Sequence, residues 1–163
     1  MSALLAVREL TDADRELIAT WRYSGELGIY DPGAGALELK PPHHVAIVTG
    51  DGMLLGFGTM GPDAQVAGGR YGSAESVLDL GVGLCPARVG QGYGPAAIEA
   101  LIAYARTQSA ATRLRVTIAA VNKRASALAY KLGFRPSHRF TRTSDARAFV
   151  QHERPVGTDP GSS

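Results

Sequence analysis

Apolar and polar residues alternate along several short stretches of the chain, and this two-residue period predicts β-strands. The clearest stretch is SVLDLGVGLC, residues 76–85, in which four apolar residues face one way while Asp79, Gly81 and Gly83 face the other. Further strands are predicted over residues 4–10, 43–49, 53–60, 113–120, 134–140 and 147–154. The second and third of these flank the turn Gly50-Asp51-Gly52 and are predicted to form an antiparallel hairpin.

Three other stretches repeat their apolar residues at helical spacing. The first follows Thr11, a predicted N-cap that Asp14 completes as a capping box. The second begins at Pro95, and the third follows the predicted N-cap Asn122 and ends at Gly133. The apolar faces comprise Leu17, Ile18 and Trp21; Ile98, Leu101, Ile102 and Ala105; and Ala125, Leu128, Ala129 and Leu132. Strands and helices therefore intermingle, which predicts a mixed α/β fold with a structured loop over 22–42, which has room for one short helix, and a Gly-rich connection over 61–75.

Residues 83–95, GLCPARVGQGYGP, join a predicted strand directly to a predicted helix. Such a loop directs backbone N–H groups and the positive end of the helix dipole at one point, which favours an anion such as phosphate. The loop lacks the Lys-Ser/Thr pair of a P-loop, and its glycine spacing does not fit a dinucleotide-binding fingerprint. Gly81 and Gly83 predict, in addition, that a ligand approaches this backbone closely in a cleft that the two glycines leave open; a bulge or a tight sheet crossing is the alternative.

The composition is that of an ordinary globular protein of 163 residues, with 45% hydrophobic residues, one cysteine and a net charge of +2. This length predicts one domain over residues 1–155, followed by a disordered tail over 156–163. A single cysteine excludes an internal disulfide, and the small charge argues against a nucleic-acid partner. No apolar run reaches the ~20 residues of a membrane helix and no signal peptide is recognisable, so we expect a soluble, cytoplasmic protein.

Two motifs resemble those of the GCN5-related N-acetyltransferases, the GNAT superfamily. In that family a strand ends in proline and a loop Arg/Gln-x-x-Gly-x-Gly/Ala leads into a helix; here Pro86 precedes Val89-x-x-Gly92-x-Gly94. The second motif, a strand ending in Asn and a helix closing in Lys-Leu-Gly-Phe, is similar to VTIAAVNKRASALAYKLGF, residues 116–134. The stretches WRYSGELGIYD (21–31) and LDLGVGL (78–84) resemble a bacterial branch of the family, and the resemblance extends over residues 4–154.

The resemblance implies a GNAT fold, in which a mostly antiparallel, twisted sheet of about six or seven strands is splayed at the cofactor site and flanked by about four helices. It also implies that acetyl-CoA is the cosubstrate. Val89 stands where the family has Arg or Gln, which leaves Arg88 and Gln91 to supply that side-chain contact. The residues that the resemblance places against acetyl-CoA are Val82, Leu84, Arg88, Val89, Gly90, Gln91, Gly92, Tyr93, Gly94, Asn122, Ser126 and Lys131.

Acetyl transfer to an amine requires a neutral amine, a polarised thioester carbonyl and a proton for the departing thiolate. Asp79 is the only carboxylate on the glycine-bearing face of its strand, and we predict that it is the base; a structural hydrogen bond is the alternative. Tyr130 is the predicted acid; the alternative is a half-exposed tyrosine on the helix surface, in which case water or the amine's own proton serves the thiolate. The family carries this tyrosine seven residues after Asn122, where the present sequence has Ala129, and Tyr130 is rotated from that position by about 100°.

The sequence thus predicts an acetyl-CoA-dependent N-acetyltransferase that moves an acetyl group directly to a primary amine in a ternary complex. Tyr23 and Tyr30 resemble acceptor-lining residues, and backbone N–H groups near Leu84 are expected to polarise the thioester carbonyl. The acceptor stays open between a small amine, an aminoglycoside-like compound, a polyamine and a protein N-terminus, and a homodimer stays open as well. The alternative is a non-catalytic acyl-CoA-binding sensor or interaction domain, because Ala129 replaces the usual acid. We expect no metal, nucleic-acid or membrane partner.

Overall fold

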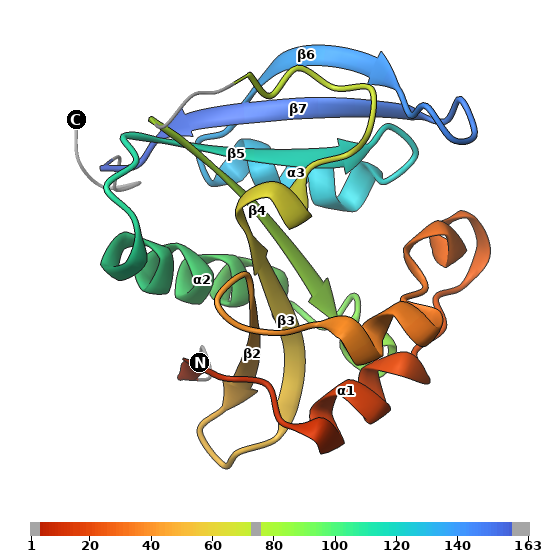
Figure 1. The fold of residues 1–163 in the computed structure, drawn as a ribbon, viewed down its shortest axis with the longest axis vertical. Helices are drawn as coiled ribbons and strands as arrows, with labels where there is room; N and C mark the ends of the chain where they lie inside the picture. The colour runs from red at the N-terminus through yellow and green to blue at the C-terminus, as the bar shows by residue number, and fades with distance from the viewer. Residues whose placement is uncertain (1–3, 73–75, 158–163) are drawn as a thin grey trace. The chain divides into compact units, whose positions relative to one another are not determined.

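The computed structural model describes residues 4–72 and 76–157 of the chain (Figure 1). Its strands are β1 (Leu5–Arg8), β2 (His44–Thr49), β3 (Leu54–Met60), β4 (Val77–Leu84), β5 (Arg113–Ala119), β6 (Arg135–Thr141) and β7 (Ala148–Pro155). Its α-helices are α1 (Asp12–Ala19), α2 (Gly94–Gln108) and α3 (Lys123–Lys131), and the 3₁₀ helices are η1 (Gly25–Tyr30), η2 (Gly33–Glu38), η3 (Gly61–Ala64) and η4 (Pro86–Arg88). The predicted mixed α/β fold is confirmed. The predicted tail lies, from residue 158 on, outside the described residues.

The chain divides into two compact units, each made of two segments. Unit 1 comprises Met1–Thr59 and Val82–Ala105, and unit 2 comprises Met60–Gly81 and Arg106–Ser163. The seven-stranded sheet has the order β1-β2-β3-β4-β5-β7-β6. Strands β1 and β2 belong to unit 1, β5, β6 and β7 belong to unit 2, and β3 and β4 have residues in both units. The recorded strand registers are antiparallel except for the parallel pair β4 and β5, as predicted for a mostly antiparallel sheet.

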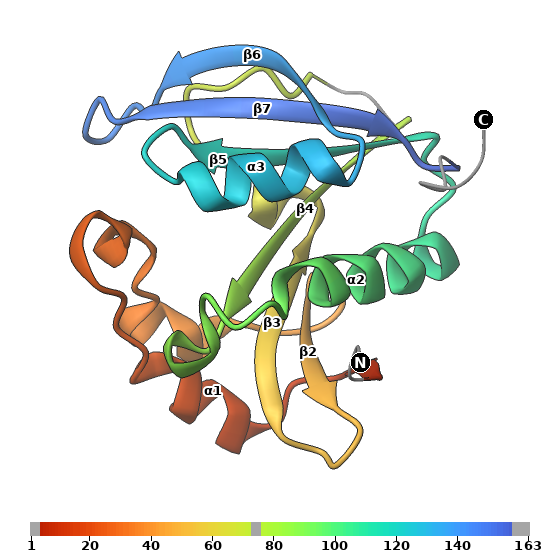
Figure 2. The ribbon, with the colours of Figure 1, turned by 180° about the vertical axis from the view of Figure 1, so that it is seen from behind.

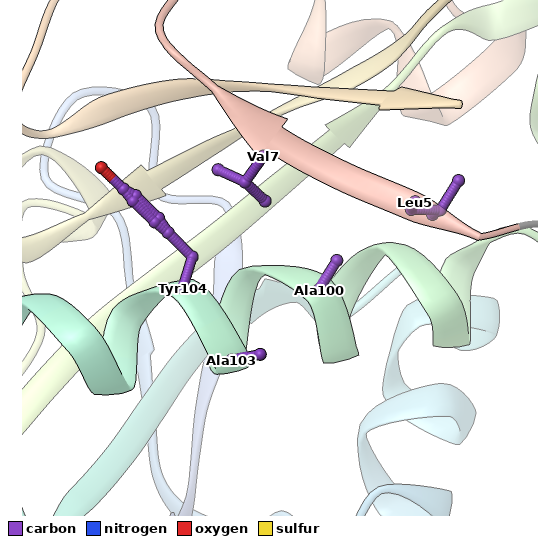
Figure 3. A pocket seen from close by; sticks show the side chains of 5 residues that line it. All are labelled: Leu5, Val7, Ala100, Ala103 and Tyr104. Atoms are coloured by element: carbon purple, nitrogen blue, oxygen red, sulfur yellow. The ribbon is translucent and has the colours of Figure 1, made fainter. Parts of the chain in front are cut away.

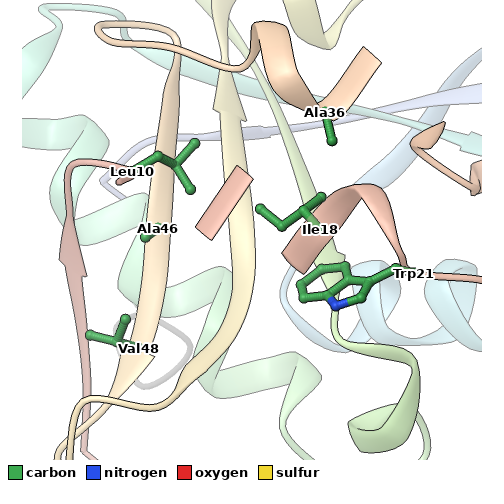
Figure 4. Packing of buried hydrophobic residues seen from close by; sticks show 6 residues of the cluster. All are labelled: Leu10, Ile18, Trp21, Ala36, Ala46 and Val48. Carbon is green, nitrogen blue, oxygen red and sulfur yellow. The ribbon is translucent and has the colours of Figure 1, made fainter. Parts of the chain in front are cut away.

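Unit 1 buries an apolar cluster beneath α1 and beside β2, shown in Figure 4, whose members are Leu10, Ile18, Trp21, Ala36, Ala46 and Val48. The helix begins as predicted: the Thr11 hydroxyl accepts the Asp14 N–H at 3.1 Å, and the Asp14 carboxylate accepts the Thr11 N–H at 2.8 Å. Ile18 lies on the buried face of α1, whereas Trp21, predicted on the same helical face, follows the end of the helix at Ala19 and packs in the same cluster. The prediction that Leu17 lies on the buried face was wrong, since the Leu17 side chain is 49% exposed. Leu17 directly precedes Ile18, and successive helix residues point in directions about 100° apart.

Helix α2 packs on the strands of unit 1 (Figure 2). It contacts β3 at a glycine, Gly58, which has no side chain to separate helix and strand. A Cβ atom added to Gly58 on β3 would lie 2.6 Å from Cδ1 of Leu101, a fully buried α2 residue. Glycine at this position therefore lets the helix approach the sheet closely. The helix begins at Gly94, one residue before the predicted start at Pro95.

Unit 2 contains the parallel pairing. Strand β4 pairs with β5 from Val77 opposite Arg113 to Leu80 opposite Val116, and β5 pairs along its whole length with β7. Strands β6 and β7 correspond to the two strands predicted over 134–140 and 147–154, and they form an antiparallel pair. Helix α3 begins at the predicted cap, where Asn122 Oδ1 accepts the Ala125 N–H at 3.2 Å. It ends before Gly133, whose φ of +92° is in the left-handed region that favours glycine.

His152, in the middle of β7, gives unit 2 an expected pH dependence. Its ring is buried and its Nε2 atom has no hydrogen-bond partner within the described part of the chain. Burial lowers the pKa of His152 because it disfavours the charged ring. The unfolded chain takes up this proton near pH 6.5, whereas the folded chain resists it. The free energy of unfolding is therefore expected to fall as the pH drops below about 6.5, until the lowered pKa is passed.

Urea unfolding at several pH values between 7.5 and 5 measures this dependence. The variant His152→Phe removes the titrating ring and should show a flatter pH profile than the wild type. His138→Phe, on β6, changes a partly exposed histidine and serves as the control. A profile that is as steep in His152→Phe as in the wild type would contradict the prediction.

Candidate active site

Several backbone N–H groups of the loop between β4 and α2 have no acceptor among residues 4–72 and 76–157. After the turn η4, the N–H of Val89 donates to Pro86 O and the N–H of Gln91 to Arg88 O, both at 3.3 Å. By contrast, within the described residues no acceptor is recorded for the other N–H groups between Val89 and the start of α2, those of Gly90, Gly92, Tyr93 and Gly94. Part of the predicted set of converging amides is thus used internally, and the larger part is available.

The backbone conformation of this loop depends on its glycines. Gly90 and Gly92 have φ values of +82° and +87°, which side-chain-bearing residues rarely adopt. A Cβ atom at Gly92 would meet nothing within 4 Å, so the loop is open to solvent at this point. The free N–H groups lie directly before the first turn of the 15-residue helix α2. Together with the helix dipole they can bind an anion.

Arg88 and Gln91, the two side chains expected to replace the missing family Arg or Gln, make local contacts. Arg88 Nη2 lies 3.2 Å from the Met53 sulfur, and Gln91 Nε2 donates to Ala87 O at 2.8 Å. Gln91 is exposed and Arg88 is partly exposed. Both contacts are weak or local ones, which a bound anion can replace.

Gly83, near the end of β4, leaves room for a side chain of the neighbouring strand. A Cβ atom at Gly83 would lie 2.5 Å from Cε1 of Phe57, whose ring occupies the space, and a Cβ at Gly56 would collide with the Gly83 carbonyl. The prediction of an open cleft at Gly83 was therefore wrong, because the Phe57 ring fills that space, and the alternative of a tight crossing by a neighbouring strand holds there. The side chains of Val82 and Leu84 pack, with Tyr93, against a second buried cluster of unit 1, formed by Ile47, Leu55 and Ala97. The side chains of Val82 and Leu84 therefore belong to the core, and any contact of these two residues with a ligand would come from their backbone.

Tyr23 is attached to the same strand end. Its hydroxyl donates to Leu84 O at 2.6 Å, and its N–H donates to Asp31 Oδ1 at 2.7 Å. Burial, with smaller effects of Cys85 and Asp31, raises the pKa of Tyr23 to about 12, so its hydroxyl stays protonated. Tyr30, at the end of η1, is exposed. Of the two predicted acceptor-lining tyrosines, Tyr30 thus has the more solvent-exposed side chain.

In unit 2, Asp79 forms a buried ion pair that the sequence did not predict. Arg115 Nε donates to Asp79 Oδ1 at 2.6 Å and Arg115 Nη2 donates to Oδ2 at 2.9 Å, while Gln65 Nε2 donates to Oδ2 at 3.0 Å. Asp79 is only 3% exposed. The hydrogen bond to Asp79 holds the pKa of Arg115 above its usual value despite burial. Arg115 also lies 4.8 Å from the centre of the Tyr71 ring.

This ion pair bears on the predicted base, because both carboxylate oxygens already accept hydrogen bonds. An amine proton would have to displace the guanidinium or Gln65 amide from Asp79. The pairing follows from the parallel register that places Asp79 opposite Arg115. Arg115 alternates with the apolar residues of β5, which places it on the face away from Leu114 and Val116; only the register of the strands identifies its partner.

Helix α3 presents Tyr130 outward. Its side chain is 60% exposed, and the Arg135 guanidinium lies 4.0 Å from the ring centre. Ala129, at the family's tyrosine position, is buried, as the rotation between neighbouring helix positions requires. Of the remaining α3 candidates, Ser126 is partly exposed and Lys131 is exposed.

A shallow hollow of about 440 Å³ lies elsewhere in unit 1, between β1 and α2 (Figure 3), lined by Leu5, Val7, Ala100, Ala103 and Tyr104. None of the predicted site residues lines it. Over residues 4–72 and 76–157, no group of three His, Cys, Asp or Glu side chains is arranged to hold a metal ion. The helices in these ranges are all too short or too polar to cross a membrane.

The family model for the acetyltransferase (GNAT) domain matches residues 5–135 of this sequence. The chain therefore belongs to the GNAT acetyltransferase family, and it is an N-acetyltransferase. No curated protein matches the sequence with significance.

Solved structures share the fold at low sequence identity. A GNAT-family acetyltransferase from Bacillus anthracis has a TM-score of 0.73 and 15% identity, covering 97% of this chain and 98% of that one. A chimera of spermidine N-acetyltransferase SpeG from Vibrio cholerae and hSSAT has a TM-score of 0.71 and 15% identity, covering 94% and 96%. A GCN5-related N-acetyltransferase from Kribbella flavida has a TM-score of 0.60 and 24% identity, covering 93% and 98%. At these identities the likeness establishes the fold alone.

Proposed function

We propose that this enzyme transfers the acetyl group of acetyl-CoA directly to a primary amine in a ternary complex. The observation that carries the proposal is the loop before α2, in which the N–H groups of Gly90, Gly92, Tyr93 and Gly94 have no recorded acceptor within the described residues. A pyrophosphate needs several such donors at one point. The loop has the position of the family motif, between the strand that ends near Pro86 and helix α2.

The residues present fit acetyl-CoA in this role. The loop amides would hold its pyrophosphate, with Arg88 and Gln91 close enough to contribute side-chain contacts. The backbone of Val82 and Leu84 would bind the pantetheine arm, because their side chains belong to the core. Asn122, Ser126 and Lys131 stay predictions from the second motif, since Asn122 also serves as the cap of α3.

Acetyl-CoA would supply the acetyl group, which becomes bonded to the amine nitrogen as the carbon–sulfur bond breaks, while the amine loses a proton and the thiolate gains one. The chain's part is to orient the thioester and polarise its carbonyl, which backbone N–H groups near Leu84 can do without a side chain. The role of Asp79 as the base stays a prediction, and its ion pair with Arg115 argues against that role. Water is the alternative proton acceptor. Tyr130 as the acid stays a prediction from its place on α3.

The proposal is tested by two measurements on the full chain. Calorimetry should detect acetyl-CoA binding, and thiol release from acetyl-CoA should rise with at least one member of a panel of amines. The panel includes spermidine, because a fold neighbour is a spermidine N-acetyltransferase, together with aminoglycosides and peptides with free N-termini. Absence of acetyl-CoA binding would refute the cofactor assignment. Binding without thiol release on any amine would favour the non-catalytic alternative.

A further inference from the structure

The hydroxyl of Tyr23 binds β4 at the edge of the strand that faces away from β3. Carbonyl and N–H groups of successive strand residues point to opposite edges. The N–H of Cys85 donates to Leu55 O at 2.8 Å and therefore points toward β3. The Leu84 carbonyl points to the other edge, and there it accepts the Tyr23 hydroxyl at 2.6 Å. The N–H of Leu84 lies on that same edge.

Three segments of unit 1 are linked through this contact. The Leu84 carbonyl and the Cys85 N–H belong to one peptide group, so the hydrogen bond from Tyr23 polarises the group that donates to Leu55 on β3. Hydrogen bonds connected through one peptide group strengthen each other. Tyr23 thus holds the last peptide of β4 against β3, at the point where the strand passes into the Gly-rich loop.

Tyr23 is itself well anchored, as a positioning group must be. Its N–H donates to Asp31 Oδ1, and the Asp31 N–H donates to Gly28 O at 3.1 Å, which closes residues 23–31 into a compact loop. Two residues before it, buried Trp21 packs on the Phe57 ring at 6.1 Å between ring centres. The same Phe57 ring fills the space above Gly83. This segment of the chain therefore contacts the end of β4 twice, directly through Tyr23 and indirectly through Trp21 and the Phe57 ring.

We propose that Tyr23 is a positioning residue, whose hydroxyl fixes the Leu84 peptide so that the backbone donors at the end of β4 are aligned with the thioester carbonyl. This inference rests on the proposed function, because it assumes that acyl-CoA lies along this edge. It replaces the predicted role of Tyr23 in lining the acceptor. The reaction step is unchanged: Tyr23 gives up no proton, and it acts through the main chain.

The variant Tyr23→Phe keeps the ring and removes the hydroxyl. We expect kcat and kcat/KM for the amine to fall together by roughly 10-fold, because misalignment of a carbonyl-polarising donor acts in the transition state. The Kd for acetyl-CoA should stay within about threefold of the wild type. Amide hydrogen exchange at Cys85 should become faster, and this readout does not depend on activity. Tyr104→Phe, which removes a hydroxyl at the hollow of Figure 3 in the same unit, is the control and should change none of these values.

The outcomes separate this inference from the proposed function. Absence of acetyl-CoA binding or turnover in the wild type would remove the proposed function itself. With an active wild type, an increase in the amine KM at unchanged kcat would overturn the inference and restore Tyr23 as an acceptor-lining residue. Unchanged kinetics together with unchanged exchange at Cys85 would overturn it as well.

Discussion

Replacing Arg115 with methionine is expected to lower the free energy of unfolding by about 3–5 kcal/mol. The substitution keeps most of the side-chain volume and removes the cation that pairs with Asp79 through both carboxylate oxygens. Asp79 is then left almost completely buried with the single amide of Gln65 as its partner. A buried carboxylate without a counter-charge is costly because the interior solvates it poorly. Urea unfolding followed by circular dichroism measures the effect.

Arg113→Met is the matched control, two residues earlier on the same face of β5. Arg113 pairs with Glu153 at 3.4 Å, and its side chain is 44% exposed. Exposed pairs of this kind contribute only about 0–1 kcal/mol. Adding Asp79→Asn to Arg115→Met should recover part of the lost stability, because it removes the stranded charge. Equal losses in Arg115→Met and Arg113→Met would show that the Asp79 ion pair is not buried.

The same variants test the predicted base. If Asp79 only supports the fold, Asp79→Asn should retain thiol release in the fraction of protein that is folded. If Asp79 accepts the amine proton, the variant should lose about 100-fold or more in kcat, as general-base removal typically does. The ion pair leads us to expect the first result.

Gly92→Val is expected to weaken acetyl-CoA binding by at least about 10-fold. Gly92 has a φ of +87°, and a β-branched residue strongly disfavours that conformation. A valine would move the loop toward negative φ and turn the N–H groups of Gly92 and Tyr93 away from a common point. No atom of the chain lies within 4 Å of the added Cβ, so within the protein the substitution acts through the backbone conformation. Calorimetric titration with acetyl-CoA provides the measurement.

Gly52→Val controls for backbone strain. Gly52, in the β2–β3 turn, has a φ of +88° and likewise no atom within 4 Å of an added Cβ. The two variants should therefore lose similar stability, whereas only Gly92→Val should lose affinity. Similar acetyl-CoA affinities in both variants would argue against the loop as the pyrophosphate site.

Local structure was predictable because neighbouring residues decide it. The capping box of Thr11 and Asp14 and the cap of α3 at Asn122 were read from short-range patterns. The β2–β3 hairpin followed from a tight turn between two apolar stretches. Gly133 ended α3 because few other residues adopt its φ of +92°. Each of these features involves residues at most a few positions apart, so one stretch of sequence contains all its determinants.

Features of the candidate site that join distant segments were not predictable in the same way. Asp79 and Arg115 are 36 residues apart, and the parallel register of β4 and β5 brings them together. Tyr23 and Leu84 are 61 residues apart and meet through a side chain and a carbonyl. Of the two interpretations of Gly83, the tight crossing was the correct one, but the sequence offered no means of identifying Phe57 as the neighbour.

The sequence alone determined the order of helices and strands, their caps and turns, and the Gly-rich loop before α2, because torsional preferences and side-chain periodicity act over a few residues. The tertiary structure alone decided which polar groups are already paired: the Asp79 carboxylate with Arg115, the Leu84 carbonyl with Tyr23, and the amides of Val89 and Gln91 with the loop itself. Pairing of this kind depends on strand register and packing across long stretches of chain. The chemistry left available to a ligand is what remains after those pairings are made.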